Sequence, residues 1–321
     1  MRPKSIQHWA FAALVSLIIL IFIGAIVRVT GAGLGCPDWP TCWGKIIPPT
    51  SVEQIDFSQI DLAKFQKKAE RLGLDPATVT RESLPAEFNV RHTWTEYLNR
   101  LFALPITLTT LILMILGLRS RELRPAIRRC CVLAFVLVLA NAALGALVVL
   151  SALHTGIITV HLLLALLLTF VLVYIHRATA ENPAPITGAP RVAVAFLLLL
   201  VITEGLIGSQ IRELTDELQL AHQGEARTDW IHEIEHTAVY LIHRSFSWLI
   251  FFTTCWLFWK SRAHGTVPRL VMTTVAALMI MGVILSQIGI IALVQVLHVG
   301  LAAILSALVF HWWLAAPRRA A

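Results

Sequence analysis

The sequence predicts an all-α integral membrane protein whose eight transmembrane helices form two pseudo-symmetric four-helix bundles. The 321 residues are 57% hydrophobic and only 14% charged, which is more apolar surface than one soluble core can bury. The apolar residues are gathered in runs of about 20 residues, the length that spans a bilayer. Short motifs also recur in the same order in the two halves of the chain.

Each apolar run is predicted to be a helix, because backbone groups in hydrocarbon must satisfy their hydrogen bonds within the segment. The first run is too long for a cleaved signal peptide and lacks a small-residue cleavage site. The runs cover 8–29, 95–118, 131–152, 155–175, 192–211, 237–259, 270–290 and 292–315.

Basic residues gather in alternate connections between the runs and near both ends of the chain. The positive-inside rule places these segments, and therefore both termini, on the cytoplasmic side of a cell inner membrane. The long connections 30–94 and 213–236 then lie outside. The excess of 26 basic over 19 acidic residues needs no nucleic-acid partner. The basic residues assigned to the cytoplasmic side are Arg2, Lys4, Arg119, Arg121, Arg124, Arg128, Arg129, Arg177, Arg191, Lys260, Arg262, Arg269, Arg318 and Arg319.

Three motifs occur once in each half, in the same order and at matching ends of the runs. The pairs are Gly24–Arg28 with Gly208–Arg212, His92–Arg100 with His236–Arg244, and His161–Ala165 with His298–Ala302. The repeat predicts two units, residues 1–180 and 181–321, related by duplication. The first unit carries an extra stretch of about 40 residues in its outer connection.

Polar residues inside the apolar runs are the candidates for chemistry, because they are costly in hydrocarbon. His243 and His298 each lie a few residues inside the outer end of a run, at a common depth of roughly 10 Å. Paired histidines on facing helices can bind a haem iron from both sides. Asn99 and His161 hold the equivalent positions in the first half. A single membrane histidine could instead bond a neighbouring helix, but the repeat and the common depth favour haem.

Four arginines lie close to these positions. Arg100 and Arg244 directly follow Asn99 and His243, while Arg28 and Arg212 end their motifs. Each could form a salt bridge with a haem propionate near the outer surface. Each could also extend its side chain to the membrane interface, and the two interpretations are compatible.

Cys36 and Cys42 lie in the first outer connection, where a disulfide could form. A metal site is disfavoured because two thiols are too few ligands. A structural disulfide and a redox or thiol-relay role both stay open. The other three cysteines, Cys130, Cys131 and Cys255, are interpreted as thiols without chemistry.

The insertion contains a candidate surface helix. Residues 61–72 place Leu62, Phe65, Ala69 and Leu72 at helical spacing. This pattern predicts an amphipathic helix on the outer surface, which could cover the substrate site, contact a partner, or do neither.

The ordered set of motifs resembles the haem A synthase family. The resemblance covers nearly the whole chain except the insertion around 46–90. It is carried by Gly24–Gly31, Cys36–Cys42, Glu96, His161–Ala165, His243–Arg244 and Gln295–His298. It implies a haem-dependent membrane oxidoreductase that converts the C8 methyl of haem O to the formyl of haem A for terminal oxidase assembly.

The resemblance also implies roles for individual residues. A haem b would be bound between His243 and His298, and substrate haem O would be bound in the first half with His161 on its iron. Glu96 matches the family's catalytically important carboxylate, which could stabilise a developing cation or position water. Glu96 could also simply favour the positive end of its helix. The two outer cysteines match the family's disulfide pair.

One position departs from the family pattern. The family has histidine where this chain has Asn99, which is a poor ligand for haem iron. Substrate iron is therefore expected to be five-coordinate through His161, or to have water opposite it, and such an open position suits oxygen chemistry. Asn99 also favours an alternative function, a non-catalytic membrane haem b electron-transfer protein, whereas Glu96 and His161 oppose it.

A third class is a transporter or haem chaperone, since such proteins often contain repeats. It is disfavoured because the histidines lie toward the outer side and not at the midplane. The expected partners are the lipid bilayer, haem O, the haem O synthase that supplies it, and an electron donor. The sequence leaves open the identity of that donor, the oxygen source and the formation of a homo-oligomer.

Overall fold

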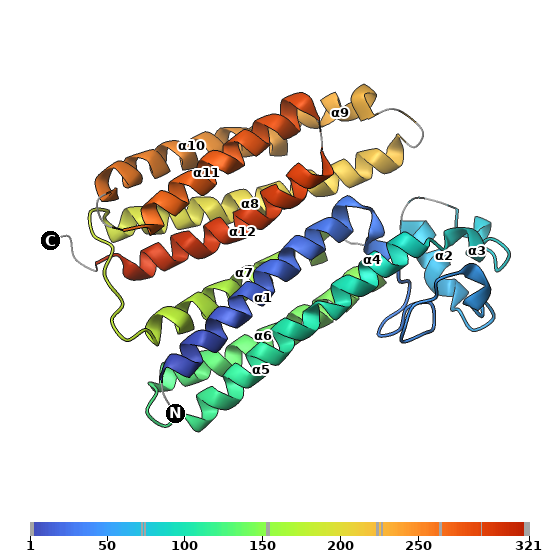
Figure 1. Cartoon of the computed structure of the whole chain (residues 1–321). Helices are drawn as coiled ribbons and strands as arrows, with labels where there is room; N and C mark the ends of the chain where they lie inside the picture. Colours follow the sequence, from blue (N-terminus) through green and yellow to red (C-terminus); the bar gives the residue numbers. More distant parts are fainter. Residues whose placement is uncertain are drawn as a thin grey trace.

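The computed structural model describes residues 3–71, 73, 75–151, 155–222, 225, 227–262, 265–289 and 291–317. Helices dominate these residues, and no β-strand occurs among them (Figure 1). Eight helical spans are long and apolar enough to cross a membrane, which confirms the predicted fold class. Of the residues used in the predictions, Arg2, Leu72, Arg318 and Arg319 lie outside the described part.

The spans match the apolar runs of the sequence. In the first half they are α1 (Pro3–Val29), α4 with α5 (Val90–Leu101 and Ala103–Arg119), α6 (Pro125–Leu150) and α7 (Thr155–Ala178). In the second half they are α8 (Arg191–Ala221), α10 (Ala238–Ser261), α11 with a π-turn (Val267–Val283 and Ile284–Ile288) and α12 (Ala292–Ala315).

Shorter elements lie in the two long connections that the sequence predicts to be on the outer side. The first contains η1 (Ala32–Leu34), η2 (Val52–Gln54), α2 (Leu62–Arg71), η3 (Pro76–Thr78) and α3 (Leu84–Glu87), and the second contains α9 (Arg227–Glu235). Helix α8 continues ten residues beyond the expected end at 211, because a polar helix can extend past the bilayer where hydropathy no longer marks it.

Each half packs as a ring of four spans. In the first half α1 contacts α5, α5 contacts α6, α6 contacts α7, and α7 contacts α1. In the second half α8, α10, α11 and α12 make the same four pairings. Each ring has its own cluster of buried apolar residues. Helices α10 and α12 therefore stand at opposite corners of the second ring, while the duplication that would explain this match stays a prediction.

The two rings meet through α1, α7, α8 and α12 (Figure 1). Gly300 of α12 lies directly against the ring of Phe22 of α1, since a Cβ at Gly300 would come within 2.1 Å of that ring. Phe170 of α7 stacks on Phe310 of α12 with centroids 4.6 Å apart. The close approach of α1 and α12 thus depends on a residue without a side chain.

Residues 30–89 form a compact outer cap beyond the end of α4 (Figure 1). Its apolar centre consists of Cys36, Cys42, Trp43, Ile55, Ile60, Phe65 and Leu84. The amphipathic helix expected in the insertion is α2, and Phe65 and Ala69 on one of its faces are buried. The Phe65 ring lies 5.6 Å from the Trp43 ring, so α2 is part of the cap's own core.

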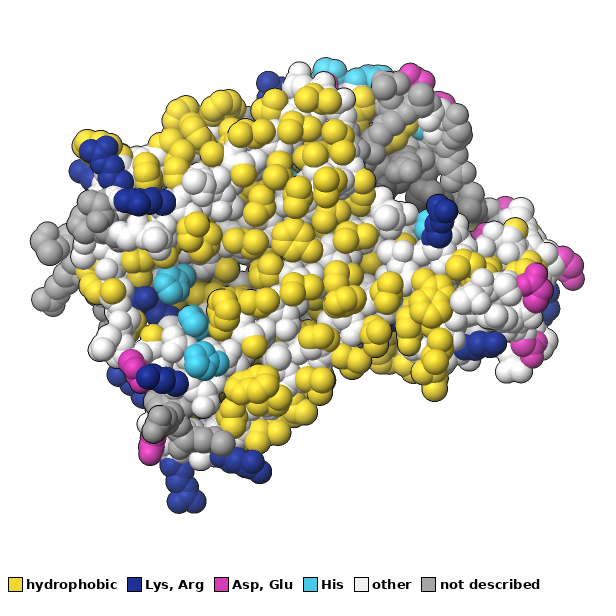
Figure 2. All heavy atoms as spheres, viewed as in Figure 1, with side chains coloured by type: hydrophobic (Ala, Val, Ile, Leu, Met, Phe, Trp, Pro, Cys, Tyr) yellow, Lys and Arg dark blue, Asp and Glu magenta, His cyan; other side chains and the backbone are white. Residues whose placement is uncertain are grey.

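The flanks of the helices are covered with hydrophobic side chains, whereas charged side chains gather near the ends (Figure 2). Large apolar residues on these flanks, such as Leu199, Phe252 and Trp259, are more than half exposed. So extensive an apolar surface suits contact with lipid and not with water. The chain is therefore a multi-pass membrane protein.

Candidate functional site

His243 and His298 come from the opposite corners α10 and α12 of the second ring. Both are partly buried, and the Nδ1 atom of each is buried without a hydrogen bond. The two residues that the sequence paired by depth therefore lie on helices of one ring, α10 and α12, which share the neighbours α8 and α11.

In each half, a glycine of the first repeated motif lies beside a key residue of the second motif. A Cβ built at Gly208 of α8 would lie 3.3 Å from Cε1 of His243. A Cβ built at Gly24 of α1 would lie 3.9 Å from Oδ1 of Asn99. The first two repeated motifs thus meet in space in each half, and Asn99 occupies the place that His243 occupies in the second.

His161 of α7 is the histidine of the first ring. Its Nδ1 is also buried without a hydrogen bond, and its ring faces Gly145 of α6, where a Cβ would lie 3.7 Å from Cε1. Asn99 lies near the end of α4, just before the break at Phe102 that separates α4 from α5. No hydrogen bond joins Asn99 to His161 in the described part of the chain.

The three histidines fit a haem in their donor chemistry. A buried imidazole is costly in an apolar medium, so each of these histidines is expected to have a function there, and binding an iron through Nε2 is one such function. Haem iron is already held by four porphyrin nitrogens and needs only axial ligands from the protein. Among the described residues no group of three or more metal-binding side chains could hold a bare ion.

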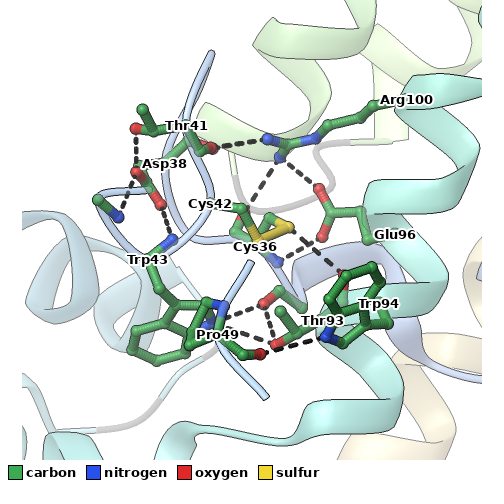
Figure 3. Close-up of a disulfide and its surroundings, with 12 residues drawn as sticks. Cys36, Asp38, Thr41, Cys42, Trp43, Pro49, Thr93, Trp94, Glu96 and Arg100 are labelled. Carbon is green, nitrogen blue, oxygen red and sulfur yellow. Dashed lines mark hydrogen bonds and ion pairs between the residues drawn. A yellow bond between two sulfur atoms is a disulfide. The ribbon is translucent and has the colours of Figure 1, made fainter. Parts of the chain in front are cut away.

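Glu96 and Arg100 are one turn apart on α4 and face the outer cap (Figure 3). Glu96 is 3% exposed. One of its oxygens accepts a hydrogen bond of 2.7 Å from the backbone N–H of Cys36, and the other accepts one of 2.5 Å from Arg100. Both carboxylate oxygens of the predicted catalytic residue therefore bind the cap or its partner on α4.

Arg100 is the centre of this contact. Its guanidinium also donates to the backbone carbonyls of Asp38, Thr41 and Cys36, at 2.9, 2.9 and 3.3 Å. Four of its five N–H donors are thus engaged, which leaves the Nε–H for any other ligand. We call Glu96, Arg100 and the loop 36–42 that they bind the cap clamp.

Cys36 and Cys42 form the expected disulfide, with Sγ atoms 1.96 Å apart (Figure 3). Both cysteines are buried, at 0% and 1% exposure, and this burial favours a structural disulfide over a thiol relay. The carboxylate of Asp38 accepts from the backbone N–H groups of Trp43 and Gly44, at 2.6 and 2.9 Å, and from the Thr41 hydroxyl. Cys130, Cys131 and Cys255 form no disulfide within the described residues.

The disulfide loop also packs closely on the backbone of α4. The Trp43 indole donates to the carbonyl of Gly35 at 2.9 Å and to the hydroxyl of Thr93 at 3.2 Å. A Cβ at Gly35 would come within 2.3 Å of the His92 carbonyl oxygen, so only glycine permits this approach. The cap is thereby fixed to the helix that carries Glu96 and Asn99.

The remaining predicted arginines lie in different surroundings. Arg212 donates to the backbone carbonyl of Arg28 at 3.1 Å, which brings together residues from the first and second halves. Arg244 is exposed.

Two residues that sequence reasoning missed lie beside His243. Glu204 of α8 accepts a hydrogen bond from the hydroxyl of Ser247, and its Oε1 lies 3.2 Å from Nδ1 of His243. A carboxylate inside an apolar run was a signal that could have found Glu204. It was overlooked because the first half has no matching acid, so the repeat did not point to it.

Comparisons with known proteins identify relatives of this chain. A family model described as cytochrome oxidase assembly protein (COX15-CtaA) matches residues 7–310. The heme A synthase of Bartonella bacilliformis is 24% identical over 272 residues, which cover 78% of this chain and 73% of that protein. The heme A synthase of Azorhizobium caulinodans is 25% identical over 310 residues, which cover 88% and 85% of the two chains.

A shorter match is more similar. The heme A synthase of Rickettsia prowazekii is 36% identical over 66 residues, which cover 21% of this chain and 19% of that protein. No solved structure matches the chain. Because the family model spans nearly the whole chain, including Glu96 and all three candidate haem histidines, this protein belongs to the cytochrome oxidase assembly family.

Proposed function

We propose that this enzyme is a haem A synthase that oxidises the C8 methyl of haem O to the formyl of haem A. The observation that carries the proposal is the set of His161, His243 and His298, each with a buried and unsatisfied Nδ1, distributed over two similar rings. The names of the relatives support the same reaction, because each matched protein is called heme A synthase.

The two rings are proposed to bind different haems. In residues 181–321, His243 and His298 would bind a haem b from two sides, because they lie at opposite corners of one bundle. In residues 1–180, His161 would bind the iron of substrate haem O. The haem groups supply the redox chemistry when bound, while the protein selects how many axial positions are filled.

Asn99 would leave the face of the substrate iron opposite His161 without a protein ligand. Its amide can accept or donate a hydrogen bond, so it could position water or another small molecule on that face. This is the chemical reason to regard the substitution of the family's histidine as compatible with oxidation. The closeness of Gly24 and Asn99 supports this placement, since it mirrors Gly208 and His243.

Glu96 is proposed to act beside the substrate methyl, where a carboxylate stabilises positive charge that develops during oxidation. The cap clamp adds a second role, because the same carboxylate binds the Cys36 amide and Arg100. Glu96 would then be held in one orientation by the cap. The propionates would be bound mainly by Arg28, Arg212 and Arg244. Arg100 could contribute only its Nε–H, because its other four N–H groups bind the cap and Glu96.

The protein is proposed to lie in the cell inner membrane with both termini cytoplasmic. The charge distribution favours this orientation. It also places the outer cap and its disulfide on the oxidising side, where disulfides persist. A haem O synthase would supply the substrate, and a separate donor would supply electrons.

The extracted haem of cells that supply haem O tests the proposal. We expect haem A, identified by chromatography and mass spectrometry, only in cells that also express this protein. A second function stays in view because Asn99 is a poor iron ligand: a haem b electron-transfer protein that modifies no haem. Unchanged haem O, together with haem b in the purified protein, would support that alternative and contradict the synthase.

A further inference from the structure

We infer that Glu204 is a positioning residue for His243, orienting its imidazole and making the haem of the second half harder to reduce. The inference rests on the proposed function to the extent that His243 is a haem ligand. It concerns a carboxylate on a different helix, which neither the repeat nor the family motifs identify.

The contact lies inside the second ring, between α8 and α10. The Ser247 hydroxyl lies within hydrogen-bonding reach of Glu204 Oε1 and of the His243 carbonyl oxygen, the latter at 2.9 Å. Nδ1 of His243 lies 3.2 Å from the same Oε1. The three side chains form one cluster within the bilayer-spanning part of the chain.

Two atoms of this cluster are incompletely satisfied. Glu204 Oε2 and His243 Nδ1 are both buried without a hydrogen bond, although Nδ1 lies only 3.2 Å from Oε1. A small rotation of the carboxylate or the imidazole would pair them and remove both penalties. The ring would then donate from Nδ1 and present Nε2 to an iron, the usual arrangement of a metal-bound histidine with a carboxylate behind it.

The first half lacks every part of this cluster. Counting from the matched glycines, the position of Glu204 corresponds to Leu20, four residues before Gly24. Counting from the paired positions, Ser247 corresponds to Ala103, four residues after Asn99. A carboxylate in hydrocarbon is costly, so a role confined to helix packing would not require one. Its presence only beside the histidine of the second half points to a function at that ligand.

The expected consequence is a lower reduction potential. A carboxylate that accepts the Nδ1 proton's hydrogen bond increases electron donation from the imidazole, and its negative charge stabilises the ferric state over the ferrous state. Removing that charge should therefore favour reduction. The effect belongs to the haem of the second half and not to substrate oxidation itself.

The test is a spectroelectrochemical titration of the purified, haem-containing protein in detergent. In Glu204→Gln, the ratio of ferrous to ferric haem b at a fixed potential should rise about tenfold, an upward shift of ~59 mV. Ser247→Ala is the matched control, because it removes a hydroxyl from the same cluster but keeps the charge. It should change that ratio by less than about twofold. An unchanged ratio in Glu204→Gln, or an equal shift in Ser247→Ala, would overturn the inference.

A second variant protects the test against a folding defect. Glu204→Leu introduces the residue of the first half, an apolar side chain that a membrane helix tolerates, and the same tenfold change is expected. A wild-type ratio in Glu204→Leu would also overturn the inference. If the wild-type protein binds no haem b at all, the proposed function fails first. If haem b is present but Glu204 does not affect its potential, only the role of Glu204 fails.

Discussion

The two halves of this protein have the same ring of four spans but different side chains at the matched positions. The second half has His243 and His298 on opposite corners, with Glu204 and Ser247 behind His243. The first half has Asn99 and His161 at the matched positions. Its candidate catalytic acid, Glu96, binds the outer cap, whereas Glu204 of the second half lies beside a histidine. In the proposed function, the shared scaffold would set the depth of the site, while a few side chains would decide which residues bind the iron.

The difference has a chemical consequence. An iron with two histidine ligands has no free position and suits electron transfer, whereas an iron with one protein ligand can accept a small molecule. Among the described residues, the outer cap is bound to the first half through the cap clamp on α4. The half proposed to bind substrate is therefore also the half that carries an additional structural unit over its outer end.

The largest expected effect comes from removing a ligand of the second half. His243→Ala or His298→Ala should abolish the low-spin spectrum of haem b, because one remaining histidine cannot fill both axial positions. Optical and electron paramagnetic resonance spectra of the purified variants check this. An unchanged low-spin spectrum in either variant would show that the pair does not bind the haem.

Removing the charge of Glu96 should reduce haem A formation by about 10²-fold, the effect of losing one electrostatic contact at a developing charge. Glu96→Gln is the sharper variant, because its amide oxygen can still accept from the Cys36 N–H or from Arg100 and so keep the cap in place. Haem b should be retained. If Glu96→Gln makes normal haem A while Glu96→Ala does not, the residue serves the cap clamp and not the reaction.

Much of the architecture could be predicted from the sequence, because lipid imposes a simple rule on length and hydropathy. The eight spans were predicted correctly for this reason, whereas the helix in the insertion was predicted from the helical spacing of its apolar residues. The pairing of His243 with His298, which was inferred from depth along two runs, stays a prediction. The identity of the contacts around Glu96 could not be predicted, since they join α4 to a loop about 60 residues earlier in the chain.

Glu204 illustrates a different limit. A repeat marks positions that occur in both halves, so it gives no signal for an acid that occurs in one half only. The function of the arginines was also underdetermined, because a long cationic side chain near the interface has many acceptors. Only the structure shows that Arg100 is bound to three carbonyls of the loop at residues 36–41.

Loss of the disulfide should have a moderate effect on stability. Cys36→Ser with Cys42→Ser opens a loop closed by a sequence separation of six, and loop-closure entropy predicts a loss of about 2 kcal/mol. The change should be confined to the outer cap of the first half, so proteolysis of the cap should accelerate while the low-spin haem b spectrum stays unchanged. Loss of that spectrum would show that the haem b site of the second half depends on the disulfide of the outer cap.

The smallest expected effect is a change in the ligands of the substrate haem iron without loss of the bound haem. Asn99→His makes the first half resemble the second, and with haem bound it should add a second low-spin species to the spectrum. The glycine beside this position leaves room for a ring, as Gly208 does beside His243. A spectrum identical to that of the wild type would show that residue 99 does not face the substrate iron.

The division of labour between the halves is tested most directly by one measurement on two variants. His161→Ala and His298→Ala are purified from cells that supply haem O, and the haems bound to each are extracted and identified. The account predicts that His161→Ala keeps haem b and loses the substrate or product haem, whereas His298→Ala loses haem b. Loss of the same haem in both variants, or of neither haem in both, would contradict two distinct sites.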